Sequence, residues 1–221
     1  MYKRQSPGST ILVKLLNRLN LKLNDVIIND ENVKNEQILD QADKLSMNYK
    51  HNDVLKLLEQ IKEPKIKEQL THYQFLKTDA KMWETRNYDD AIFGFNQLLL
   101  LHNEDIDIYT ILATCELGVA YGQKKDTDKS NFYFDQTVTL FNQFDINKNV
   151  FWSLLIIDNL AMYFSNNNNS KKCLEFINVG LKLAKKYGVA NFVDSFFYLN
   201  GEVLEERGDH EDAIKKMLCA W

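Results

Sequence analysis

The stretch Asp107–Phe144, DIYTILATCELGVAYGQKKDTDKSNFYFDQTVTLFNQF, decides the fold of this chain. Leu117, Gly118 and Tyr121 are spaced so that all three lie on one side of a helix. After a polar break, a second amphipathic run places the small residue Ser130 where two antiparallel helices would cross. The stretch therefore predicts a helical hairpin with one close-packed face.

The pattern of this hairpin recurs along the chain. Phe134 follows Ser130 by one turn and fills the gap beside it. The pattern thus consists of a small residue (Gly118), a second small residue twelve positions later (Ser130) and a large apolar residue four positions after that (Phe134). The same spacings recur twice, a third copy has a connection one residue shorter, and a degenerate half-copy precedes them. These are Ala161/Cys173/Ile177, Gly201/Ala213/Met217, Ala80/Ala91/Phe95 and Val54/Leu58.

Leu-Gly-x-x-Tyr followed by these small and large residues resembles the tetratricopeptide repeat, in which stacked helical hairpins form a superhelix. The sequence therefore predicts an all-α fold, a superhelical array of antiparallel helix pairs. The second crossing residues follow one another at steps of 37 to 43 positions, longer than the roughly 34 of the standard repeat. We therefore expect irregular repeats.

Composition agrees with this fold and excludes several function classes. The 221 residues include only 2 Pro and 8 Gly, as is typical of a chain that is almost wholly helical. A net charge of −4 does not favour a nucleic-acid binder that acts by bulk electrostatics. No apolar run approaches the length needed to cross a bilayer and no secretory signal is visible, so we expect a cytoplasmic protein.

Chemistry-bearing motifs do not predict an enzyme. The chain has no Gly-rich phosphate loop, no His-Glu-x-x-His motif and no nucleophile elbow. Its three cysteines and four histidines lack the spacing of a metal site or a disulfide framework. We therefore expect no catalytic residues, no metal and no cofactor.

The chain divides into four parts. Residues 1–8 match no later pattern and stay unassigned. Residues 9–28 include the phrase LVKLLNRLNLKLNDVI. We expect residues 29–48 to form a linker helix and residues 49–221 to form the repeat domain. The phrase resembles the last two helices of a Cro/repressor-type helix-turn-helix domain. The DNA-reading helix of such a domain comes earlier in the chain, so we expect a chain truncated at the N-terminus that does not bind an operator. Any amphipathic helix pair would look similar, which leaves a simple capping pair open.

The first helix of each hairpin lines the concave face of such an array, and extended peptides are the natural ligands of that face. Counting one and two turns from each small residue gives the expected peptide-binding residues. These are Lys77, Trp83, Glu116, Gln123, Asp158, Asn159, Met162, Asn166, Tyr198 and Glu202.

Asn159 and Asp158 are the strongest candidates in this set. An Asn amide can donate to and accept from a peptide backbone at once, which holds a ligand without dictating its sequence. Asn159 could equally bond a neighbouring helix. Tyr198 and Trp83 could anchor ligand side chains, although aromatic stripes are more often core.

The order of these parts resembles the PlcR/Rgg type of peptide-responsive transcription regulator. The motifs are Leu-Gly-x-x-Tyr at Leu117, Asp-Asn-Leu-Ala-x-x-Phe from Asp158 and Asp-His-Glu-Asp-Ala-Ile from Asp209, downstream of the helix-turn-helix remnant. The resemblance implies quorum sensing by a homodimer that binds a short signalling peptide in its concave groove and DNA through its helix-turn-helix domain. The chain departs from the pattern in lacking the DNA-reading helix and in Leu199-Asn200-Gly201. The alternative is a scaffold module that docks a protein partner without DNA-linked regulation.

Overall fold

The computed structural model describes residues 14–18, 30–62, 64, 66–101 and 106–219, and all the regular secondary structure in these ranges is helical. The predicted all-α fold is therefore confirmed. Residues 14–18 form a short helical segment, the only part of the expected helix-turn-helix remnant that lies within the described residues. The later helices are α2 (Asp30–Ser46), α3 (His51–Leu58), α4 (Lys67–Thr85), α5 (Tyr88–Leu101), α6 (Ile108–Gln123), α7 (Thr127–Phe141), α8 (Val150–Asn166), α9 (Ser170–Tyr187), α10 (Val193–Glu206) and α11 (His210–Leu218).

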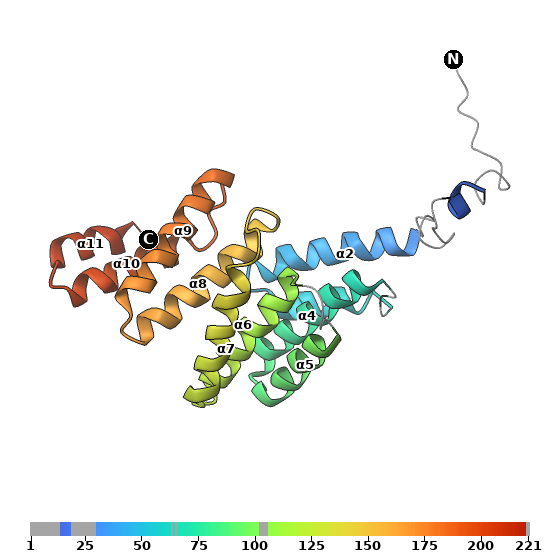
Figure 1. Ribbon diagram of the computed structural model, residues 1–221, viewed down its shortest axis with the longest axis horizontal. Helices are drawn as coiled ribbons and strands as arrows, with labels where there is room; N and C mark the ends of the chain where they lie inside the picture. Colours follow the sequence, from blue (N-terminus) through green and yellow to red (C-terminus); the bar gives the residue numbers. More distant parts are fainter. Residues whose placement is uncertain (1–13, 19–29, 63, 65, 102–105, 220–221) are drawn as a thin grey trace, which may run out of the picture.

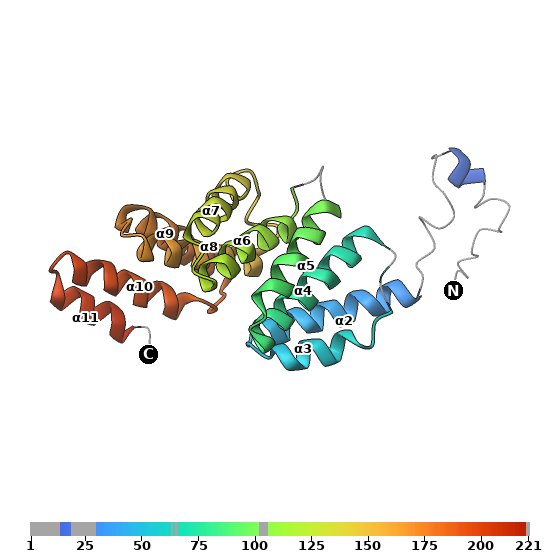
Figure 2. The same cartoon turned by 90° about the horizontal axis from the view of Figure 1, so that it is seen from below.

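Consecutive helices pack in pairs, and the pairs stack into an elongated array with α2 and α3 toward one end and α10 and α11 at the other (Figures 1 and 2). Each first helix also contacts the first helix of the next pair. This ladder of α2, α4, α6, α8 and α10 forms the inner layer of the superhelix. Within the described residues no helix is both long enough and apolar enough to span a membrane.

The small residues lie at the helix crossings, as predicted. The Ser130 hydroxyl donates to the Gly118 carbonyl oxygen at 2.8 Å, and a Cβ atom on Gly118 would lie 3.0 Å from the Phe134 ring. Cys173 and Ala213 are completely buried at the equivalent crossings. Any larger side chain at these positions would separate the two helices of a pair.

The first pair follows the same rule, which the sequence analysis recognised only in part. Ala42 precedes Val54 by twelve positions and Leu58 follows by four, and all three side chains are buried. Together they form a complete copy of the crossing set between α2 and α3. The segment expected to be a linker helix thus contains the first helix of the first pair, which also packs on α4.

One junction in the array is less closely packed than the other consecutive contacts. α7 and α8 share few contacts, and Tyr163 supplies the main ones. Its ring stacks on Phe134 with centroids 4.2 Å apart, and its hydroxyl donates to Asn131 Oδ1 at 2.9 Å. We call this junction between the third and fourth pairs the seam.

Candidate functional site

A continuous groove runs along the inner faces of α4, α6 and α8. It consists of a first pocket of about 480 Å³ and a second pocket of about 380 Å³. Trp83, Asn159 and Met162 line both pockets, so the two volumes adjoin. Volumes of this size are typical of ligand sites. We call the combined volume the inner groove.

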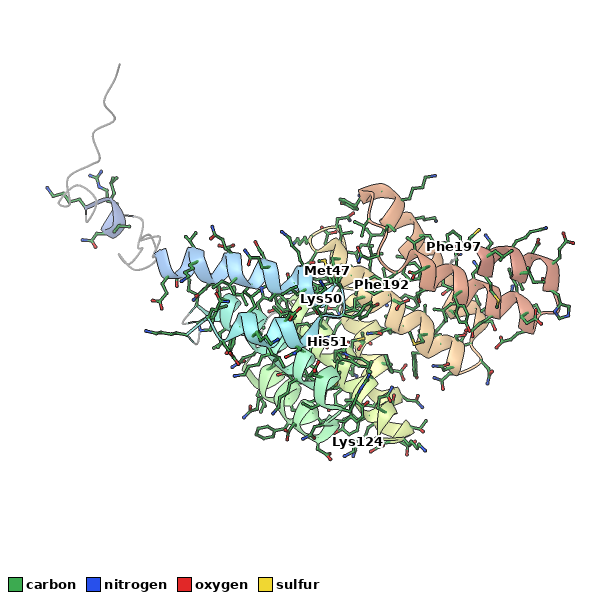
Figure 3. The ribbon with its side chains drawn as sticks, turned by 180° about the vertical axis from the view of Figure 1, so that it is seen from behind. Met47, Lys50, His51, Lys124, Phe192 and Phe197 are labelled. Carbon is green, nitrogen blue, oxygen red and sulfur yellow. The ribbon has the colours of Figure 1, made fainter. Side chains whose placement is uncertain are left out.

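Aromatic side chains from distant parts of the chain wall the first pocket. Tyr49 lies in the turn between α2 and α3 and His51 is the first residue of α3, whereas Phe151 lies in the first turn of α8 and Phe192 directly precedes α10. Figure 3 shows His51, Met47 and Phe192 in the same central region of the molecule. The curvature of the array thus brings its first pair to face the start of its last pair across the groove.

Three carboxyl groups line the first pocket. Asp79 on α4, Glu116 on α6 and Asp158 on α8 are each at most 6% exposed. Asn159 Nδ2 donates to Glu116 Oε1 at 3.2 Å, and the Ser195 hydroxyl donates to Asp158 Oδ1 at 2.5 Å. Each of three successive inner helices therefore contributes one acid to the same pocket.

Burial changes the protonation of these acids. Burial raises the pKa of Asp79 to about 7, against a smaller opposing effect of its hydrogen bond with Trp83. Burial also raises the pKa of Asp158 to about 6. The pKa of Glu116 lies well above its usual range because the group is buried and, to a lesser extent, because Asp79 is close. The pocket therefore holds protons near neutral pH that exposed carboxyl groups would have lost.

None of the three acids forms an ion pair with a Lys, Arg or His side chain of the described ranges. Glu116 Oε2 is buried without a hydrogen-bond partner, and so is Trp152 Nε1 in the wall of the same pocket. Buried polar atoms in native proteins are normally paired. His51 Nδ1, in the same lining, is also unpaired, so the first pocket offers several polar atoms to a ligand.

A metal ion does not account for this pocket. Among the described residues, no group of three or more His, Cys, Asp or Glu side chains is arranged to hold one. The geometry instead suits an organic ligand with hydrogen-bonding groups and apolar surface.

The structure brings most of the expected peptide-binding residues together. Three of them, Trp83, Asn159 and Met162, line both pockets. Glu116 and Asp158 line only the first pocket, and Gln123 and Asn166 line only the second. Lys77 lies apart, in a small hollow between α4 and α5. Tyr198 and Glu202 lie together on α10 and line neither pocket of the inner groove.

Asn159 bonds a neighbouring helix, which is one of the two roles that the sequence left open. Its amide nitrogen contacts Glu116 Oε1 and, at 3.6 Å, Cys115 Sγ on α6. Its Oδ1 accepts no hydrogen bond from the described part of the chain, so it remains able to accept one from a ligand. The two roles are therefore compatible.

Several groove residues were not predicted from the sequence, among them Asp79, Tyr49, His51 and Phe192. Asp79 directly precedes the crossing residue Ala80, and a charged residue within an apolar stripe was a usable signal. No sequence signal marked Tyr49, His51 and Phe192, because only the accumulated curvature of several helix pairs brings them to the pocket.

Solved structures with a similar arrangement of helix pairs are known. Bacillus thuringiensis PlcR, solved in complex with the peptide PapR7 and DNA, superposes with a TM-score of 0.71 at 18% identity, covering 98% of this chain and 80% of PlcR. Its apo form gives 0.73, also at 18% identity, covering 97% and 81%. This chain has the fold of PlcR.

The resemblance predicted from the sequence is thus confirmed for the fold. The TPR-like repeats of a Podosopora anserina kinesin light chain are less similar, with a TM-score of 0.52 at 13% identity over 84% of this chain and 92% of theirs. No family model and no curated protein sequence matches the chain.

Proposed function

We propose that this chain is the peptide-binding, regulatory part of a transcription regulator of the PlcR type. The observation that supports this proposal is the inner groove, in which buried polar atoms of His51, Glu116 and Trp152 have no hydrogen-bond partner. A short extended peptide matches such a groove because its backbone offers donors and acceptors at regular intervals. The likeness to PlcR, whose solved complex contains a peptide and DNA, supports the same assignment.

In this proposal the ligand is a short signalling peptide that acts in the cytoplasm in quorum sensing. The regulator is a homodimer that reaches DNA through a helix-turn-helix domain, to which residues 9–28 would belong. Ligand binding alters DNA affinity by favouring one arrangement of the two protomers over another. The peptide contacts expected from the sequence, including Lys77, Tyr198 and Glu202 outside the two pockets, belong to this proposal.

A mixed library of pentapeptides tests the peptide site. The folded chain is incubated with the library, separated by size exclusion, and the retained peptides are identified by mass spectrometry. Met162→Trp fills the inner groove from a half-exposed position, and we expect it to reduce retention at least roughly tenfold. Val179→Trp, at an equally exposed apolar position on α9, is the matched control and should retain peptides normally.

A protein-docking scaffold is the alternative function. Such a module would retain no short peptides and would bind a folded partner equally well with Met162→Trp. Light scattering of the purified chain, with and without a retained peptide, measures whether it is a dimer. A monomer at all concentrations would contradict the proposed homodimer.

A further inference from the structure

The inner groove has a charge imbalance that selects among peptides. Asp79, Glu116 and Asp158 are buried in one pocket, and the described residues offer them no cationic partner. Arg86 also lines this pocket, but it is exposed and lies 4.9 Å from the Trp83 ring centroid. Burying carboxyl groups without a countercharge is costly, so a ligand that supplies one gains affinity.

An independent feature of the same pocket also points to a cation. Glu116 is 2% exposed, and its Oε2 has no hydrogen-bond partner although its Oε1 accepts from Asn159. A single carboxylate oxygen in this state suits a donor that carries positive charge, because charge-assisted hydrogen bonds are the strong ones. The unpaired Trp152 Nε1 could donate to a carbonyl oxygen of the same ligand.

The walls of the pocket favour the same chemistry. Trp83, Tyr49 and Phe151 surround the acids with aromatic rings, which attract organic cations through their π faces. His51 stacks near Trp83, with ring centroids 6.4 Å apart, and burial lowers its pKa. A largely neutral His51 does not repel a cation at neutral pH.

Resting on the proposed function, we infer that the inner groove recognises a peptide through a positively charged group seated at Glu116 within the aromatic walls of the first pocket. The group is an organic cation with N–H donors, either the ammonium at the amino terminus or a Lys or Arg side chain. Peptides whose groove-facing groups are acidic are disfavoured by the same charges.

Binding of a cationic peptide is coupled to the release of protons from the pocket. The free pocket holds protons on acids whose pKa values burial raises, and a cation at Glu116 favours the ionised forms, so binding releases protons. The other titratable or charged groups around the acids are Tyr49 and His51 beside α2 and α3, Arg86 at the end of α4, Cys115 on α6 and Asp194 on α10. A neutral acid that merely donated a hydrogen bond to the ligand would keep its proton, so binding would release none.

Two pentapeptide libraries test the inference, one with free and one with acetylated amino termini. Selection as above should retain basic peptides at least roughly tenfold over acidic ones, or should require the free amino terminus. Acetylated peptides enriched in Lys or Arg assign the side chain, whereas retention of the free library alone assigns the terminal ammonium. Equal retention of both libraries without basic enrichment overturns the inference and leaves the proposed function intact. Retention of no peptide overturns both.

Matched variants locate the effect. Glu116→Gln keeps the shape of the side chain and should abolish the basic preference, and Asp158→Asn should weaken it. Glu175→Gln removes the same charge from an exposed position on α9 and should leave the preference unchanged. Circular dichroism confirms that each variant is folded. Loss of the preference in Glu175→Gln, or its persistence in both other variants, overturns the assignment to this pocket.

Calorimetry with the best-retained peptide, in phosphate and in Tris at pH 7, counts the linked protons. We expect the wild-type chain to release between about half and one proton on binding, and Glu116→Gln to release fewer. Binding to the wild-type chain without proton release, or with proton uptake, would overturn the cationic assignment.

Discussion

At the residue scale, Asp79 is a buried carboxyl group in the first pocket that lowers the stability of the fold. A carboxyl group with no countercharge lies in an otherwise apolar helix face, 5% exposed. An apolar residue of similar size would stabilise the fold better, since it requires no desolvation of charge. Strained or costly groups of this kind concentrate at functional sites.

Asp79 makes the stability of the chain dependent on pH. Unfolded Asp79 loses its proton near its ordinary pKa of 3.8, whereas the folded protein holds it up to a pKa of about 7. The folded state therefore binds more protons between these values, and stability falls as pH rises through this window. We expect Asp79→Asn to be more stable than the wild-type chain at pH 8, by up to about 4 kcal/mol, and little different at pH 4.

Urea unfolding at pH 4, 6 and 8 measures this difference. Asp53→Asn, at an exposed and largely solvated carboxyl group on α3, provides the control and should show no such trend. A variant that gains no stability at the higher pH would mean that Asp79 is ionised at little cost in the folded chain.

At the element scale, the close approach of helices limits which side chains are tolerated. Gly180 on α9 faces both α8 and α10, and a Cβ atom there would lie 2.5 Å from Phe196 Cζ and 3.1 Å from Ile157 Cγ2. Both neighbours are completely buried, so neither can move aside easily.

We expect Gly180→Ala to destabilise the chain by about 1–3 kcal/mol, despite the better helix propensity of Ala. Gly122→Ala on α6 is the contrasting substitution, because its Cβ would meet only the Ser130 side chain, with the hydroxyl oxygen at 3.2 Å. That variant should be neutral or slightly stabilised. Thermal unfolding measures the stability of both variants. Equal melting temperatures would contradict the packing described for α9.

The helix pairs could be predicted from the sequence because their crossing residues are local signals. Ser130, Cys173 and Ala213 each occupy a position where only a small side chain allows two neighbouring helices to touch. Ala42 obeys the same rule but was missed, because the polar surface of α2 resembles that of a linker. The aromatic wall around His51 could not be predicted, since it depends on the summed rotation of several pairs rather than on any one spacing.

At the scale of the whole molecule, the seam divides the array into two parts. The contacts across it include those of Tyr163 with α7, the bonds of Asn159 to α6 and the edge-to-face contact of Trp152 with Phe75 on α4. The second pocket lies at the same junction, lined by residues of α6, α7 and α8. In repeat arrays such a weak interface limits how cooperatively the two sides unfold.

We expect Tyr163→Ala to separate the unfolding of the two sides, with a loss of about 2 kcal/mol. Hydrogen exchange at moderate urea should then show residues 150–218 losing protection before residues 67–141. Tyr163→Phe keeps the ring stack, loses only the bond to Asn131 and should unfold as one unit. Parallel loss of protection in Tyr163→Ala would show that α6 and α8 alone couple the two sides.

The orientation of α2 adds a mechanical consequence. Its Ser46 end lines the first pocket, while its Asp30 end points away from the pocket toward one end of the array (Figure 1). A helix of 17 residues is about 25 Å long, so a tilt of about 10° at the pocket displaces the far end by about 4 Å. A small tilt of α2 at its pocket end therefore moves its Asp30 end further than it moves the wall of the pocket.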